Sequence, residues 1–72
     1  MAESVYKVIE LVGTSSEGWE QAVSAAVGRA SQSIRDLRIA EVSELDVQIE
    51  NGAVTAYRAK IKVSFKYSAG DN

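Results

Sequence analysis

Residues 13–16, Gly-Thr-Ser-Ser, separate two hydrophobic patterns of different period in this 72-residue chain. Before them, apolar residues alternate from Val5 to Val12, on two largely apolar faces, which predicts a strand. After them, from Glu17 to Arg35, apolar residues recur at spacings of three and four, which predicts an amphipathic helix. We therefore expect a strand-to-helix turn at residues 13–16. In this turn Gly13 supplies backbone freedom and a serine caps the helix N-terminus.

An anion site at the same helix N-terminus is the alternative interpretation, because the first N–H groups of a helix have no partner within the helix. However, Glu17 and Glu20 are expected to place negative charge in the first turn. The stretch also lacks the glycine-rich length and the lysine of a phosphate-binding loop. The sequence therefore favours the plain turn.

The second half of the chain predicts two long strands joined by a tight hairpin at Asn51-Gly52, a pair typical of a type I′ turn. Within residues 37–50 the apolar phase slips between Val42 and Leu45. The slip predicts a bulge or bend, with the two halves touching different neighbours. Residues 55–67 alternate between apolar and mainly basic side chains. The order β-α-β-β predicts an α+β fold in which a three-stranded antiparallel sheet wraps around one helix.

The length allows one domain, and we expect it to span residues 1–72, with an ordered core at about 4–67 and a flexible tail at 68–72. A chain this small buries only about 60% of the surface that its unfolded form exposes. The helix is rich in small residues, and Trp19 is expected to pack in the core or at an interface. Because apolar surface remains uncovered, the sequence predicts assembly with further copies.

Composition narrows the classes of function. The chain has no histidine and no cysteine, which removes the commonest general base, the thiol nucleophile and the usual transition-metal ligands. We therefore expect no enzyme, and any bound metal would be a hard cation with oxygen ligands. A net charge of −2 argues against nucleic-acid binding. With no signal-peptide pattern and no long apolar run, we expect a cytoplasmic protein without membrane contact.

Five segments of the chain match the pattern of one known protein family. They are Tyr6-Lys7-Val8-Ile9-Glu10-Leu11-Val12-Gly13-Thr14-Ser15, Trp19-Glu20-Gln21-Ala22, Arg29-Ala30, Glu41-Val42 and Val63-Ser64-Phe65. Over about residues 5–67 the chain thereby resembles the dodecin family. The resemblance implies a hollow homododecamer, and many dodecins store flavins, riboflavin or FMN, in stacked pairs between subunits.

Three positions that match the family's flavin pocket are substituted in this chain. Ile39 stands where flavin-binding members have an aromatic residue, Ala40 where phenylalanine is common, and Arg58 where a glutamine contacts the flavin. An aliphatic side chain offers no flat face for ring stacking, and arginine cannot accept a hydrogen bond. The combination is similar to a calcium-binding subgroup of the family. It implies a storage or buffering shell for calcium or another divalent cation, with flavin storage as the alternative.

Three carboxylates that could hold such a cation surround the phase slip of the second strand. These are Glu41, Glu44 and Asp46, and the last two share one strand face because they are two residues apart. One carboxylate per subunit, repeated around a symmetry axis, would build a site rich in oxygen ligands. The plainer interpretation is that each acid is solvated or is paired across the sheet with Arg38, Lys60 or Lys62.

Overall fold

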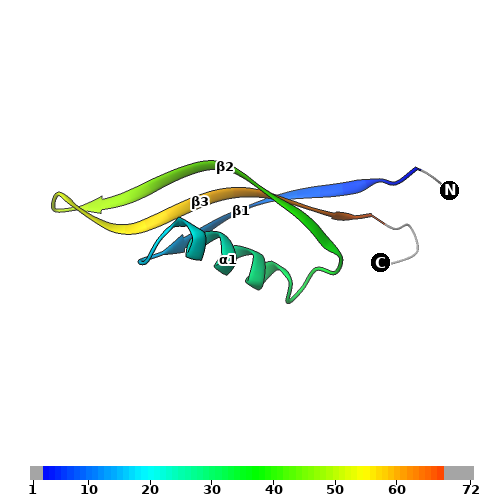
Figure 1. The fold of residues 1–72 in the computed structure, drawn as a ribbon, viewed down its shortest axis with the longest axis horizontal. Coiled ribbons are helices and arrows are strands. Elements are labelled where there is room, and N and C mark those ends of the chain that lie inside the picture. Colours follow the sequence, from blue (N-terminus) through cyan, green and yellow to red (C-terminus); the bar gives the residue numbers. More distant parts are fainter. Residues whose placement is uncertain (1–2, 68–72) are drawn as a thin grey trace.

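The computed structural model describes residues 3–67, so the predicted tail at 68–72 lies outside the described residues. The strands form one antiparallel sheet in the order β1-β3-β2, and the helix lies against one face of it (Figure 1). The predicted β-α-β-β order and the three-stranded antiparallel sheet around one helix are confirmed. The elements are β1 (Tyr6–Ser15), α1 (Trp19–Ala30), β2 (Leu37–Glu50) and β3 (Ala53–Lys66).

β1 runs through most of the stretch that was predicted to be a turn. Residues 13–15 pair with β3, so the connection to the helix comes later, at residues 16–18. Gly13 is buried, and a Cβ atom there would overlap the carbonyl oxygen of Ala22 and lie 3.0 Å from the Cβ atom of Ala26. Gly13 is therefore required by the close approach of α1 to β1, and the prediction that it serves a sharp exit from the strand is wrong.

α1 begins later than the predicted helix. Gly18 is the N-cap residue, and no side chain caps the helix. The Ser15 hydroxyl instead accepts a hydrogen bond from the Glu17 N–H at 3.0 Å, before the helix begins. The acidic residue in the first turn is Glu20 alone, so the predicted placement of Glu17 in that turn is wrong.

α1 also ends earlier than predicted, at Ala30 and not at Arg35. Residues 31–33 form turns, and the Ser31 hydroxyl donates a hydrogen bond to the Gly28 carbonyl at 2.8 Å. Serine side chains compete in this way for backbone groups, which makes them poor continuations of a helix. Asp36, with φ 61°, then adopts the left-handed conformation that aspartate tolerates better than most residues.

The core lies between α1 and the inner face of the sheet, which is the face that the helix covers. Ile61 and Val63 of β3 are its largest fully buried side chains, and burying one such side chain stabilises the fold by about 1.5–3 kcal/mol. The predicted apolar face of the last strand is confirmed. The other core members are small, namely Ala22, Ala26 and Ala59, and the half-buried apolar residues packed around them are Ile9, Leu11, Val23, Val27 and Leu37.

β2 pairs with β3 along its whole length, with shifts of register on the way. One shift lies between Val42 and Glu44, and the Ser43 hydroxyl donates to the Lys60 carbonyl there at 3.0 Å. The predicted bulge is confirmed, but within this chain both halves of β2 pair with the same strand, contrary to the prediction. The hairpin at Asn51-Gly52 has φ values of 54° and 79°, as a type I′ turn requires.

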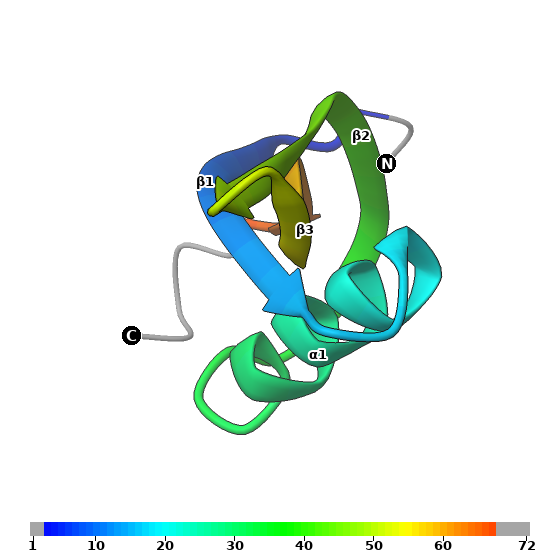
Figure 2. The same cartoon turned by 90° about the vertical axis from the view of Figure 1, so that its left-hand side faces the viewer.

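The chain is elongated, with extents of 54 × 20 × 15 Å and a radius of gyration of 14.8 Å, against about 11 Å for a compact domain of this length. α1 packs mainly on β1 and β3 and barely reaches β2. The β2–β3 hairpin therefore extends past the helix (Figure 1), while the end-on view shows the sheet curling over α1 (Figure 2). Among residues 3–67, no helix is long and apolar enough to cross a membrane.

Candidate functional site

The outer face of the sheet, turned away from α1, carries a basic central strand with acids on both sides. In the register, Glu10 of β1 and Glu41 of β2 both lie beside Lys62 of β3. Residues directly opposite each other on neighbouring strands share a face. Along β2 the three predicted cation ligands therefore form one row on the outer face, and the basic residues opposite Glu41, Glu44 and Asp46 are Lys62, Lys60 and Arg58.

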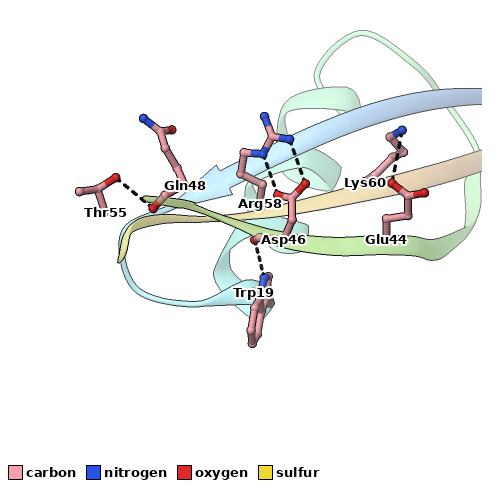
Figure 3. Close-up of polar contacts among 7 residues, drawn as sticks. All are labelled: Trp19, Glu44, Asp46, Gln48, Thr55, Arg58 and Lys60. Carbon is pink, nitrogen blue, oxygen red and sulfur yellow. Dashed lines mark hydrogen bonds and ion pairs between the residues drawn. The ribbon is translucent and has the colours of Figure 1, made fainter. Parts of the chain in front are cut away.

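Asp46 is held by Arg58 through two parallel hydrogen bonds (Figure 3). Arg58 donates from Nε to Oδ1 at 2.7 Å and from Nη2 to Oδ2 at 2.9 Å. These hydrogen bonds, aided by the charge of Arg58, hold the pKa of Asp46 below its ordinary value despite an opposing effect of burial. They also raise the pKa of Arg58. A cation that binds Asp46 must therefore compete with a bidentate arginine, the stronger kind of ion pair.

Glu44 and Glu41 are less constrained than Asp46. The Glu44 carboxylate lies 3.6 Å from the Lys60 ammonium, and its side chain is 67% exposed, so this contact is a loose surface ion pair. Glu41 forms no salt bridge with any residue from 3 to 67. The cross-strand pairing that was the plainer interpretation is confirmed for Glu44 with Lys60. For Asp46 the partner is Arg58, which the sequence reasoning did not name.

The donor chemistry of this row fits a hard divalent cation, because every available ligand is an oxygen. The number of donors in one chain does not suffice, since within the described part of the chain no three acidic side chains gather closely enough to hold a metal ion. A strand spaces neighbouring side chains of one face several ångströms apart along an extended backbone. A complete coordination shell in this chain therefore needs further oxygens from other copies or from water.

The three positions that match the family's flavin pocket are divided between the faces of the sheet. Ile39 lies opposite Ser64 on the outer face and is 65% exposed, whereas Ala40 lies opposite Val63 and turns inward. Arg58 is on the outer face, but its guanidinium is engaged by Asp46. Ile39 and Arg58 are thus the two positions that a ligand on the outer face could reach.

Trp19 approaches the same part of β2 from the inner side (Figure 3). Its Nε1–H donates a hydrogen bond to the backbone carbonyl of Asp46 at 3.0 Å. Its ring meets Tyr57 edge-on, with centroids 5.2 Å apart and planes at 80°. The start of α1 is therefore tied to the hairpin, in keeping with the packing role predicted for Trp19. No local spacing rule could have found this hydrogen bond, because the two residues are 27 apart in the sequence.

With the fold and the charged face described, the chain can be compared with known proteins. Residues 5–68 match the model of one protein family, described as Dodecin. This chain belongs to the dodecin family. The resemblance noted in the sequence is thereby confirmed over nearly the whole of the described chain.

Named relatives and solved structures of other dodecins give the scale of the similarity. The calcium dodecin of Mycobacterium tuberculosis is 49% identical over 63 residues, which cover 88% of this chain and 89% of that protein. The dodecin of Thermus thermophilus is 44% identical over 62 residues, with 86% and 90% covered. The chain has a TM-score of 0.88 and 43% identity to the dodecin structure from Streptomyces coelicolor, with 94% of this chain and 97% of that one covered.

One of the similar solved structures is that of a calcium-binding relative. The crystal structure of the Mycobacterium tuberculosis calcium dodecin, described as calcium-chelating and as having a novel calcium-binding site, has a TM-score of 0.81 to this chain. The two are 46% identical, and the match covers 96% of this chain and 99% of that chain.

Proposed function

We propose that this dodecin is a non-enzymatic binding shell, a homododecamer that stores or buffers a divalent cation, with calcium the first candidate. The observation that carries the cation part is the row of Glu41, Glu44 and Asp46 on the outer face of β2. The assembly supplies what one chain lacks, because symmetry copies can bring their carboxylates to a shared axis. The similarity to a calcium dodecin supports the choice of ion.

The assembly part rests on apolar residues that the chain leaves uncovered on the outer face. Val8 and Val12 of β1 are each 54% exposed and lie opposite Ser64 and Lys60 of β3, on the side away from α1. Exposed aliphatic side chains of this kind mark contact surfaces when they are grouped. We expect wild-type protein to have a native mass near twelve chains, and Val8→Glu to lose that mass. A variant with unchanged elution in size-exclusion chromatography would remove this face from the assembly.

The cation part is tested by calorimetry with calcium chloride on the assembled protein. Glu44→Ala is expected to weaken calcium binding at least tenfold, because a carboxylate ligand is lost. Glu20→Ala, which removes an acid from the first turn of α1 and leaves the row intact, is the matched control and should bind as wild type does. Equal calcium uptake by Glu44→Ala and wild type would exclude Glu44 as a ligand.

Flavin storage is the alternative, and the exposed position of Ile39 is the observation that keeps it open. An aromatic ring at this position would present a flat face to an isoalloxazine, which isoleucine does not. We expect riboflavin or FMN fluorescence to be quenched weakly by wild type and more strongly by Ile39→Trp. Strong quenching by the wild-type protein would favour flavin storage over the cation shell.

A further inference from the structure

The tip of the β2–β3 hairpin has no buried side chain. Every residue from 48 to 55 is exposed, and the tip extends past α1 (Figure 1). The contacts of Trp19 with the hairpin lie further back, at the Asp46 carbonyl and the Tyr57 ring. A segment with few buried contacts opens locally at a small cost in free energy. The backbone at the tip is therefore held mainly by the turn at Asn51-Gly52.

This turn places an asparagine side chain next to an unhindered backbone nitrogen. The backbone nitrogen of Gly52 can attack the side-chain Cγ of Asn51, because a bond between these two atoms closes a five-membered ring. Glycine has no Cβ to obstruct the attack, and no other group lies within 4 Å of the place where a Cβ atom of Gly52 would be. Both residues are exposed, so water reaches the reacting atoms.

The hydrogen bonds around the turn leave both reacting groups free. Among residues 3–67, neither the Gly52 N–H nor the Asn51 side chain forms a hydrogen bond within the chain. The neighbouring Glu50 carboxylate accepts one from Nε2 of Gln48 at 3.0 Å, and the Thr55 hydroxyl donates one to the Gln48 carbonyl at 3.3 Å. The fold therefore stabilises the strands on either side of the turn and engages neither the amide of Asn51 nor the N–H of Gly52.

We propose that Asn51 is a site of spontaneous deamidation, a covalent modification that needs only water. The Gly52 nitrogen gives its proton to solvent and forms a bond to Cγ of Asn51, the bond from Cγ to the amide nitrogen breaks, and ammonia leaves. Water then opens the resulting succinimide. Cleavage of the new bond between nitrogen and Cγ yields aspartate, and cleavage of the original peptide bond yields isoaspartate.

The two products have different effects on the hairpin. Each adds one negative charge beside Glu50. Aspartate keeps the turn, because Asp-Gly pairs suit type I′ turns and aspartate tolerates the positive φ of this position. Isoaspartate has one more carbon in the main chain, which lengthens the loop that fixes the pairing of Glu50 with Ala53. Only the isoaspartate product should therefore loosen the tip.

The first test follows the reaction by mass spectrometry in wild-type protein kept in mildly alkaline buffer. Trypsin releases residues 39–58 as one peptide, whose side-chain amides are those of Gln48 and Asn51. Replacement of –NH2 by –OH is expected at Asn51 alone, since Gln48 would have to close a larger ring. The rate should lie within about tenfold of that of the free peptide, because the exposed turn opens at a cost of no more than about 1.4 kcal/mol. A rate more than about tenfold below that of the free peptide would overturn the proposal.

The second test replaces Asn51. Asn51→Gly removes the amide and keeps a residue pair that suits the turn, so ion-exchange chromatography should show acidic species accumulating in wild type and not in this variant. Equal accumulation in both proteins would contradict the assignment to Asn51. Asn51→Asp has the added charge from the start, and its hairpin should exchange backbone hydrogens as slowly as that of wild type. The isoaspartate form of aged wild type, separated on the same column, should exchange faster at residues 48–55.

The outcomes separate this inference from the proposed function. Deamidation is measured from the mass of one peptide, and it requires neither calcium nor a particular particle mass. Calcium binding by wild type together with an unmodified Asn51 contradicts the deamidation site and leaves the cation shell standing. Modification of Asn51 in a protein that binds no calcium contradicts the cation shell and supports the deamidation site.

Discussion

β1 and β2 both pair with β3, but the helix covers much more of β1 than of β2. Ile9 and Leu11 of β1 pack against the core, while Val42 and Leu45 of β2 remain about half exposed. The reason is length, since a helix of 12 residues spans about 18 Å and a strand of 14 residues spans about 46 Å. A single short helix can cover only the part of the sheet nearest to it. Because α1 lies over β1 and β3, β2 is the strand whose inner face is left for other contacts.

The largest effect on the free energy of unfolding is expected where α1 covers the sheet. Ile61→Ala removes a fully buried side chain from β3 and should lower the free energy of unfolding by about 2–5 kcal/mol. Val42→Ala, directly opposite on β2, should mainly raise the concentration at which the particle dissociates. Denaturant unfolding at one protein concentration and dilution followed by light scattering measure the two effects. An equal loss of unfolding free energy in both variants would contradict the difference in burial between Ile61 of β3 and Val42 of β2.

The second prediction concerns the contact that makes β1 the covered strand. Gly13→Ala places a Cβ atom against the Ala22 carbonyl and should lower the unfolding free energy by about 1–3 kcal/mol, the usual cost of overpacking. Gly28→Ala is the matched control on α1, because a Cβ atom there meets nothing within 4 Å. It should raise stability by about 0.5–1 kcal/mol through helix propensity. Thermal melts of the two variants should shift in opposite directions, and a common direction would show that the close approach is not what requires Gly13.

A smaller change is expected where the helix does reach β2. Trp19→Phe keeps an aromatic ring beside Tyr57 but loses the indole N–H that bonds the Asp46 carbonyl. We expect a loss of about 0.5–1.5 kcal/mol in the free energy of unfolding, the net value of one such hydrogen bond. Hydrogen exchange should report faster opening of the β2–β3 hairpin. Unchanged hydrogen exchange in this variant would mean that the stability of the hairpin does not depend on the Trp19 hydrogen bond.

The smallest effect is expected from acid, on the outer face. The folded-state pKa of Asp46 is lowered, so the pair with Arg58 stabilises the fold at pH values above the unfolded pKa of about 4. That contribution is lost as the pH falls through the folded-state pKa. Asp46→Asn and Arg58→Gln should each flatten the pH dependence of the melting temperature below about pH 4 by the same amount. Unequal slopes for the two variants would mean that Asp46 and Arg58 do not titrate as a pair.

Local patterns in the sequence led to correct predictions where a single local preference decides the structure. The hairpin follows from Asn51-Gly52, the bulge from the slip after Val42, and the buried face of β3 from strict alternation. The errors in the bounds of the elements lie at the helix ends. There the pairing of residues 13–15 with β3 prolonged β1, and the serines after Ala30 ended α1.

The candidate site was predicted less completely than the fold. The sequence placed Glu41, Glu44 and Asp46 on one strand and limited any metal to oxygen ligands. The pairing of Asp46 with Arg58 depends on the register between β2 and β3, and the bulge at residue 43 sets that register. Local spacing cannot give the register across a bulge, since each extra residue reverses the faces of everything that follows.

The amino-acid sequence by itself determined the order of the elements, the hairpin, the apolar and charged faces of β3, and the chemistry that any ligand must have. These follow from local backbone preferences and from side-chain types, which need no knowledge of distant contacts. The tertiary structure decided why Gly13 must be glycine, which acid meets which base, and which strand the helix leaves uncovered. All three depend on how closely segments far apart in the chain approach each other, and that distance is set by packing.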